Sequence, residues 1–568
     1  MVVDPLSITF FPPIFSPTSH PPHSSYTWLF GLACIFSFVC AFGIGANDVA
    51  NSFASSVGAK ALTMGQAILV AAIMEFGGAV LLGSSVTDTI KGGITKSSVF
   101  EKTPDVFLYG FVCVMFAAAF WDNFACHMSL PVSTTHTTVG ATMGMALASF
   151  GGKAVQWAPK KKDFPFYGGL VPIFLSWIFS PVLAGIFVTL LFIPLRMIVL
   201  RSPNSFGRAL FVLPMCVFLT FFVLVVFIIQ SGAKNNQWKS FSDGKAVGIG
   251  AGFAVGTAAI AAALGWLVLK PRILAEAEGV AARAAAAKAA AMEAAASKEG
   301  GGEAAAARAA AMADIDAAAG VGQQSAFGAR MSTAWANFKA TRVGDLLTNN
   351  VVSRTMSYGA SYKVHDHIET DDRVAELWRD AEVFDTSTER LFRYLQVFTA
   401  CAMSFAHGSN DVANAMGPFS AVYATWQTGK VPGAKSSVPT WILAIGGAGI
   451  VAGLTTYGYK IMAVLAVKSV KLTNSRGFCV ELATAMTVVL ASRYGLPVST
   501  TQVVCGAVLS MGLMEGGKGV NWRMAARIAV GWVLTLIVAC GVSAGFTAFG
   551  LYTPNKFASL AAGAAPKA

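Results

Sequence analysis

The chain has 568 residues, of which 55% are hydrophobic and only 12% are charged, and its mean hydropathy is +0.60. Soluble domains carry about 25% charged residues, so this composition excludes a soluble protein and predicts an integral membrane protein. The net charge is +12, but no basic-aromatic patch or nucleic-acid motif occurs. We therefore expect the basic residues to contact lipid headgroups, and we expect no nucleic-acid partner.

The first apolar segment leads directly into a polar motif. Residues 1–26 contain no Lys or Arg and are interpreted as a disordered tail. Residues 27–46 are uncharged and long enough to cross a bilayer. They run into Gly45-Ala46-Asn47-Asp48-Val49-Ala50-Asn51. Ionisable groups at membrane depth usually mark a binding site or an ion path, although a single copy could also be polar glue between helices.

Four further apolar segments complete the first half, at residues 65–87, 106–121, 128–150 and 164–195. The first of these contains a single charge, Glu75. The segment at 128–150 opens with Pro131-Val132-Ser133-Thr134-Thr135-His136, which is too polar for contact with lipid. We expect this motif to be buried in protein or to line a cavity. The prolines of the last segment predict a tilted or kinked helix.

Two plainer spans, 209–230 and 246–269, precede a hydrophilic insert. Its alanine-rich part, Glu276 to Ala319, favours a solvated helix and has no large side chains with which to build a core. We divide the chain into six parts: a tail (1–26), a first membrane repeat (27–208), two additional transmembrane helices (209–269), the insert (270–390), a second membrane repeat (391–552) and a C-terminal tail (553–568).

The second half is predicted to contain apolar segments at 392–410, 437–459, 461–475, 478–492, 496–514 and 525–552. Both motifs recur here, as Gly408-Ser409-Asn410-Asp411-Val412-Ala413-Asn414 and Pro497-Val498-Ser499-Thr500-Thr501-Gln502. The aspartate precedes the serine by 85 residues in the first half and by 88 in the second. Two motifs that recur in the same order at similar spacing predict two homologous repeats.

These repeats determine the predicted fold. Seven crossings between the two signatures would turn the second repeat upside down in the membrane. We therefore predict an all-α polytopic membrane protein with about 12 membrane segments, two inverted-topology repeats and broken or re-entrant helices.

The polar motifs are expected to meet near the membrane midplane and to form one site. Helix N-termini with small hydroxyl residues suit a tetrahedral oxyanion. Neither motif contains Lys or Arg, so an anion beside Asp48 and Asp411 would be repelled unless cations bound with it. Carboxylate, amide and carbonyl oxygens are ligands that hold Na⁺ in transporters. The sequence thus predicts a site in which the anion and the cation bind together.

Three other polar residues are less clearly assigned. Glu75 and Glu481 are lone carboxylates inside apolar segments, and both a packing role and a transport role are open for them. His136, which is replaced by Gln502 in the second repeat, is interpreted as a polar residue with satisfied hydrogen bonds.

The duplicated Asn-Asp motif resembles the paired signatures of the inorganic phosphate transporter (PiT) family, which includes the sodium–phosphate symporters of animals and fungi. The Pro-Val-Ser-Thr-Thr pair and Glu481-Leu482-Ala483-Thr484-Ala485 are also similar to family motifs. The resemblance covers both membrane halves but not the insert. It implies extracellular termini and a cytosolic insert, whereas the positive-inside rule applied to the lysine-rich loops between residues 91 and 162 favours the opposite orientation.

The resemblance also implies roles for individual residues. Phosphate would be bound by Asn47, Ser133, Thr134, Thr135, Asn410, Ser499, Thr500 and Thr501. The expected Na⁺ ligands are Asp48, Asn51, Asp411 and Asn414. Glu75 and Glu481 would be needed for transport.

We therefore expect a secondary active symporter in the plasma membrane, which imports inorganic phosphate by alternating access and is driven by the Na⁺ gradient. It would be no enzyme and would use no cofactor apart from co-transported Na⁺ or H⁺. Its partners would be phosphate, Na⁺ and membrane lipid, and a homodimer is a candidate assembly. No P-loop motif occurs, so ATP is not expected to supply the energy.

Several alternatives remain open. The same fold could be driven by H⁺, it could carry another oxyanion, or the chain could be a phosphate sensor or receptor that transports nothing. A hydrolase triad of Ser133, His136 and Asp48 is disfavoured, because Gln502 could not act as the base in the second repeat.

Overall fold

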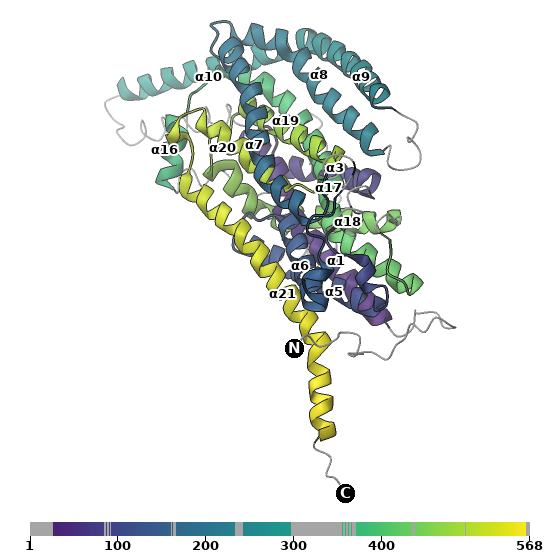
Figure 1. Cartoon of the computed structure of the whole chain (residues 1–568). Helices are drawn as coiled ribbons and strands as arrows, with labels where there is room; N and C mark the ends of the chain where they lie inside the picture. Colours follow the sequence, from purple (N-terminus) through teal and green to yellow (C-terminus); the bar gives the residue numbers. More distant parts are fainter. Residues whose placement is uncertain are drawn as a thin grey trace, which may run out of the picture.

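The computed structural model describes residues 26–84, 93–160, 166–232, 242–296, 371–433, 438–494 and 496–563, with seven single residues between these ranges. Its elements are helices (Figure 1), and extended pairing in these residues is confined to two isolated bridges, Thr95 with Val155 and Lys160 with Tyr167. Eight helical stretches among them are long and apolar enough to cross a membrane. The predicted all-α membrane fold is therefore confirmed.

The first half begins with α1 (Thr27–Asn47) and, after Asp48, continues as α2 (Val49–Gly58). A capping box at Thr63 and Gln66 then starts the next helix, because each side chain accepts a hydrogen bond from the other residue's backbone N–H. The further elements described in this half are α3 (Met64–Leu82), η2 (Ser97–Phe100), α5 (Pro104–His127), α6 (Thr134–Phe150), η3 (Gly151–Ala154) and α7 (Leu170–Pro194).

Among the described residues, three helices lie between the two halves. The π-helical turn η4 (Leu195–Leu200) ends α7, and α8 (Ser205–Gly232) and α9 (Asp243–Leu264) then pack against each other along one edge of the bundle (Figure 1). A second π-helical turn, η5 (Gly265–Leu269), leads into α10 (Lys270–Ala296). The start of the alanine-rich tract is therefore helical, as predicted, and its remainder lies outside the described residues.

The second half starts with the short α16 (Asp372–Asp380) and the long α17 (Thr386–Thr428). The Asp385 side chain caps α17 at its start, and Gly429, with a positive φ of 68°, ends it in the left-handed conformation that glycine adopts without strain. The following elements are α18 (Thr440–Ala463), η6 (Val464–Lys468), α19 (Asn474–Arg493), α20 (Thr500–Leu513), η7 (Gly517–Gly519) and α21 (Trp522–Gly563).

Two details of the prediction were wrong. The second signature does not interrupt a helix, because α17 runs through Gly408–Asn414 without a break, whereas the first signature does coincide with the boundary between α1 and α2. No separate segment forms over residues 461–475 either. Here α18 ends in η6 at Lys468, and Lys471 donates to the carbonyl oxygen of Trp378, so the charged residues end the span.

The two halves pack reciprocally. Helix α1 lies against α18 and α3 against α17, so the first two helices of each half contact those of the other half. In the same way α6 packs on α21 and α20 packs on α7. This exchange of partners is the arrangement expected of two repeats related by a two-fold axis.

Glycines make the two central crossings close. A Cβ on Gly45 of α1 would collide with the backbone of Ile450 in α18, and one on Gly453 would collide with the backbone of Phe42 in α1. The crossing of α3 and α17 uses Gly78 and Gly408 in the same reciprocal way. Small residues at such crossings let helix backbones approach each other, which is how membrane helices associate in the absence of water.

The α1–α18 crossing gives a first prediction. Changing Gly453 to Ala should destabilise the folded protein by about 1–3 kcal/mol or more, because a backbone carbonyl cannot move aside as a side chain can. The yield of monodisperse protein in detergent and its melting temperature measure this loss. Gly541→Ala in α21 is the matched control, since no atom lies within 4 Å of the added methyl group. Equal melting temperatures for the two variants would contradict the close-crossing interpretation.

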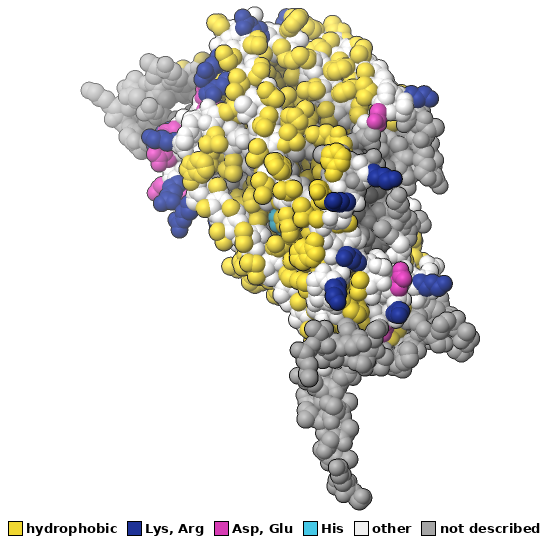
Figure 2. Space-filling model, in the orientation of Figure 1, with side chains coloured by type: hydrophobic (Ala, Val, Ile, Leu, Met, Phe, Trp, Pro, Cys, Tyr) yellow, Lys and Arg dark blue, Asp and Glu magenta, His cyan; other side chains and the backbone are white. Residues whose placement is uncertain are grey.

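The outer surface suits a lipid environment. Figure 2 shows a broad hydrophobic face, with Lys and Arg side chains gathered toward its ends. On α7, for example, Ile178, Phe179 and Leu190 are 63–65% exposed. Apolar side chains therefore point outward while the polar signature residues are buried, which is the reverse of a soluble protein.

An ion-pair cluster joins the ends of several helices. Glu382, just before α17, forms ion pairs with Arg196 of η4 and with Arg201, which follows η4. Glu515, after α20, pairs with the buried Arg476 of α19 at 2.8 Å. Partial burial alone would raise the pKa of Glu382, but hydrogen bonds from Arg201 and Arg196 outweigh this effect and hold the pKa below its usual value. The cluster thus links the ends of α17 and α20, which belong to the second repeat's polar motifs, to η4 and α19.

This cluster gives a second prediction, on pH. Because the pKa of Glu382 is lowered in the folded state, the ion pairs stabilise the protein fully above the unfolded-state pKa of about 4.3 and lose their effect as the pH falls through the folded-state value. Glu382→Gln should therefore lower the melting temperature at pH 7, and the difference from the unchanged protein should vanish in acid. A difference that persists below pH about 3 would show that packing, and not charge, is responsible.

Candidate functional site

The helices α6 and α20 begin beside the signatures. Each is capped by the serine of its Pro-Val-Ser-Thr-Thr motif: Ser133 Oγ accepts from the His136 N–H at 3.3 Å, and Ser499 Oγ accepts from the Gln502 N–H at 3.2 Å. Both serines therefore act as N-caps in this structure. The N-termini of two buried helices meet the signature residues, and helix N-termini are favourable positions for anions.

Asp48 receives hydrogen bonds from both repeats. Thr134 donates to Asp48 Oδ2 from its hydroxyl at 2.5 Å and from its backbone N–H at 3.2 Å. Thr501 of the other repeat donates to Asp48 Oδ1 at 2.7 Å, and Asn51 donates to the same threonine oxygen at 2.8 Å. The Asp48 carboxylate is thus positioned by the first turn of α6 in one repeat and the first turn of α20 in the other.

Asp411 has the corresponding partners. The hydroxyl of Thr500 donates to Asp411 Oδ2 at 2.7 Å, and Asn410 donates to Asp411 Oδ1 at 2.7 Å. Asn414 reaches across to the first repeat, where its amide donates to the hydroxyl oxygens of Thr134 and Thr135, each at 3.2 Å. All nine residues named in the last two paragraphs are buried, and they come from all four motifs, so the four motifs meet in one place as predicted.

Asn47 differs from the other predicted ligands because the chain itself uses its amide. Its Nδ2 donates to the carbonyl oxygen of Leu130 at 3.1 Å, and its Oδ1 accepts from the Val132 N–H at 3.0 Å. These bonds hold the segment that leads into α6. In contrast, Oδ1 of Asn51 and Oδ1 of Asn410 are buried without a hydrogen-bond partner among the described residues, so each of these two oxygens is available to a ligand.

A histidine that the sequence reasoning missed completes the centre of the site. His407 Nε2 lies 2.8 Å from Asp411 Oδ2, and one ligand atom from each of Asp48, His407 and Asp411 lies within 4.8 Å of the others. His407 precedes Asp411 by one helical turn, which places both on the same face of α17. In the described part of the chain, the hydrogen-bond donors to the two aspartates are hydroxyl, amide and backbone N–H groups, and none is a lysine or arginine.

The two glutamates lie in different surroundings. Glu75 accepts from Ser404 at 2.9 Å and lies 2.9 Å from His407 Nδ1, so His407 joins Glu75 to Asp411. Glu481 does not reach the aspartates. Four donors surround it, namely Ser55 and Ser56 of α2 at 2.6 Å and Thr399 and Gln396 of α17 at 2.6 and 3.1 Å. Glu481 therefore links α2 to α17 beside the site.

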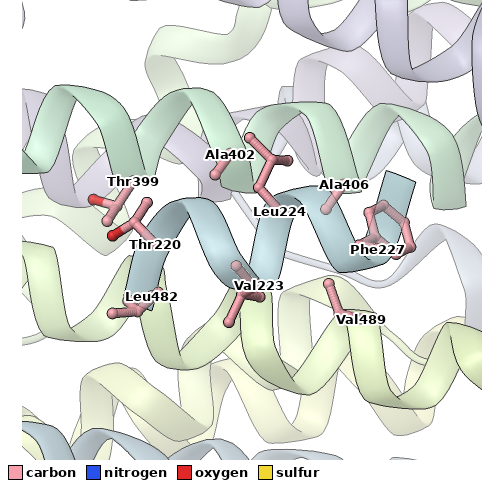
Figure 3. Close-up of a pocket in the computed structure, with 10 residues that line it drawn as sticks. Thr220, Val223, Leu224, Phe227, Thr399, Ala402, Ala406, Leu482 and Val489 are labelled. Carbon is pink, nitrogen blue, oxygen red and sulfur yellow. The ribbon is translucent and has the colours of Figure 1, made fainter. Parts of the chain in front are cut away.

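Next to Glu481 lies a small apolar cavity between α8, α17 and α19 (Figure 3). Thr220 and Thr399 lie at one end of it and Phe227 at the other. Its volume of about 10 Å³ is roughly what a single water molecule needs, so it cannot hold phosphate.

A larger cleft lies beside α16 and α21, and one of its lining residues, Leu130, contacts the site. It has a volume of about 1000 Å³ and is lined by Leu130, whose carbonyl oxygen accepts from Asn47, and by residues of α16 and α21. Charged side chains of both signs line it, namely Asp371, Asp372, Arg373, Arg523 and Arg527.

The remaining sequence-based assignment concerns His136. Its ring stacks on Trp177 at 3.6 Å between centroids, and its Nδ1 has no hydrogen-bond partner among the described residues, so the expectation of a satisfied polar residue was wrong. The Ser133 hydroxyl contacts the backbone N–H of His136 and not its ring. The geometry of a Ser-His-Asp triad is therefore not formed.

Residues 44–543 match the model of the phosphate transporter family. This chain belongs to the phosphate transporter family. Its recognition from the duplicated signature is therefore confirmed.

Relatives support the same family across both halves. The phosphate-repressible phosphate permease of Neurospora crassa is 32% identical, over 90% of this chain and 96% of its own length. A putative phosphate permease of Haemophilus influenzae is 31% identical, over 90% of this chain and 94% of its own. A solved structure named as the sodium-dependent phosphate transporter is 29% identical, with a TM-score of 0.64, and the match covers 92% of this chain and 98% of that one.

Proposed function

We propose that this family member is a symporter, which imports inorganic phosphate together with Na⁺ by alternating access. The proposal depends on one observation: Asp48 and Asp411 lie in one buried cluster, and each accepts a hydrogen bond from a threonine hydroxyl at the start of α6 or α20. Two carboxylates at this depth repel an anion unless cations bind first, and their oxygens are suitable Na⁺ ligands. The Na⁺ dependence named for the similar solved structure supports the same choice of ion.

The roles within this site follow from the donors. Phosphate would be held by the hydroxyls of the two Ser-Thr-Thr motifs and by the N-termini of α6 and α20, and Na⁺ by Asp48, Asn51, Asp411 and Asn414. Glu75 would hold α3 to α17 through Ser404 and His407. Glu481 would connect α2 to α17 through its four hydroxyl and amide donors. The reciprocal packing supports two inverted-topology repeats. The count of about 12 membrane segments and the six-part division given above belong to the same proposal.

The cleft beside α16 would be the aqueous route between this site and one side of the membrane. Arg523 and Arg527 would attract phosphate there, and Asp371 and Asp372 would attract Na⁺. The protein would lie in the plasma membrane with the insert in the cytosol, and it would contact lipid through the hydrophobic face. A homodimer remains an expectation.

Coupling to H⁺ is the second candidate, and one observation favours it. His407 lies between Glu75 and Asp411, and an imidazole between two carboxylates is a group that can carry a proton. Purified protein in liposomes separates the two candidates. We expect labelled phosphate to accumulate when an inward Na⁺ gradient is imposed at equal pH. Sodium coupling would be contradicted if accumulation followed an imposed proton gradient and did not change when choline replaced Na⁺.

A further inference from the structure

A fifth buried carboxylate, Asp122 of α5, lies near the site but has no role in it so far. Its side chain is fully buried. Oδ1 accepts from the hydroxyl of Thr137 in α6 at 2.6 Å, whereas Oδ2 has no hydrogen-bond partner among the described residues. Gly43 of α1 faces it, since a Cβ on Gly43 would lie 2.9 Å from the Cβ of Asp122.

Asp122 differs in this respect from the other buried carboxylates of the described chain. Asp48, Glu75, Asp411 and Glu481 each accept hydrogen bonds or an imidazole contact on both of their oxygens. A buried carboxylate with one free oxygen is costly unless a cation or a proton accompanies it. Asp122 therefore lacks a partner that its position requires.

The second repeat shows that the fold does not need this polar pair. Asp122 lies eleven residues before Ser133, and Val488 lies eleven residues before Ser499. Thr137 follows Ser133 by four residues, and Val503 follows Ser499 by four. Both valines are buried. The helix pair α19–α20 thus packs with two apolar residues where α5–α6 carries a carboxylate and a hydroxyl.

The Thr137 hydroxyl brings a carboxylate oxygen of Asp122 and a carbonyl oxygen close together. Thr137 Oγ1 lies 2.6 Å from Asp122 Oδ1 and 3.1 Å from the carbonyl oxygen of Ser133. Carboxylate, hydroxyl and carbonyl oxygens are hard ligands of the kind that bind Na⁺. The same turn of α6 carries Thr134, which donates a hydrogen bond to Asp48. A cation bound here would therefore also hold the start of α6 in place at the transport site.

We propose that Asp122, Thr137 and the Ser133 carbonyl oxygen form an additional Na⁺ site, present in the first repeat and missing from the second. This inference rests on the proposed function, because the site would supply one of the Na⁺ ions that travel with phosphate. Its binding would draw α5 and α6 together and so prepare Ser133 and Thr134 for the anion.

The test compares four variants of the full-length protein in liposomes. Asp122→Asn removes the charge, and the double variant Asp122→Val with Thr137→Val installs the pair that the second repeat already accommodates. Asp122→Glu keeps the carboxylate, and Asp105→Asn makes the same chemical change as the first variant in the first turn of the same helix. Uptake of labelled phosphate is measured against Na⁺ at constant ionic strength, and ²²Na⁺ is counted with each phosphate carried.

We expect Asp122→Asn and the double valine variant to raise the half-saturating Na⁺ concentration by about tenfold and to carry one Na⁺ fewer with each phosphate. Their KM for phosphate at saturating Na⁺ should stay within about twofold, Asp122→Glu should restore much of the Na⁺ dependence, and Asp105→Asn should match the unchanged protein. An unchanged Na⁺ curve and ion ratio in an active Asp122→Asn or double variant would overturn the proposal. A shifted pH profile with an unchanged Na⁺ curve would assign the position to a proton and would also overturn it. If phosphate uptake by the unchanged protein did not depend on Na⁺, the proposed function itself would be contradicted.

Discussion

Asp48→Asn and Asp411→Asn should each reduce Na⁺-driven phosphate uptake by about tenfold to a hundredfold. Each change keeps the shape of the side chain and removes one negative charge from the shared cluster. The lost coordination of a charged ligand is worth roughly 1.5–3 kcal/mol, which corresponds to this range of affinity. The double variant should be little worse than either single one, because transport already fails when one carboxylate is lost.

Surface expression and melting temperature must be checked for each of these variants. Ser133→Ala and Ser499→Ala provide a contrast, since they should weaken phosphate binding more than Na⁺ binding. Each of them should also lose about 1 kcal/mol of stability as an N-cap. Near-normal uptake in either Asp→Asn variant would remove that repeat from the site and contradict the shared-site account.

His407→Ala should be nearly as damaging. The imidazole lies 2.9 Å from Glu75 and 2.8 Å from Asp411, and all three side chains are buried. Its removal leaves two carboxylates in a low-dielectric site without their shared partner, a type of change that typically costs 3–5 kcal/mol. We expect a large loss of folded protein and of transport.

Two further variants separate the causes of that loss. Glu75→Gln combined with His407→Ala should recover stability, because one of the uncompensated charges is removed with the imidazole. His127→Ala, at the end of α5, is the control and should leave both properties intact. If His407→Ala alone had the same melting temperature and phosphate uptake as the unchanged protein, the imidazole between Glu75 and Asp411 would contribute nothing to stability or transport.

The sequence predicts the convergence of the four motifs because duplication is visible in it. Asp48 with Asp411, and Thr134 with Thr500, recur in order and at similar spacing, so their meeting in one site required only that the repeats pack together. His407 could not be found in this way. It precedes Asp411 by four residues, but the equivalent position before Asp48 is Ile44, so the repeat carries no signal for it.

The same limit applies to Asp122 and Glu481. Val488 stands at the position equivalent to Asp122, and the donors Ser55 and Ser56 of Glu481 lie more than 420 residues away along the chain. The unbroken course of α17 was also hidden, because similar motifs suggested similar helix breaks. Side chains without a counterpart in the other repeat become informative only when long-range packing is known.

Equilibrium binding of phosphate to the purified protein tests the central claim most directly. If bound cations offset the repulsion between phosphate and the two aspartates, the dissociation constant of phosphate should be at least about tenfold lower in NaCl than in choline chloride at the same pH. By linkage, phosphate should strengthen Na⁺ binding by the same factor. Phosphate that binds equally tightly in both salts would contradict the account.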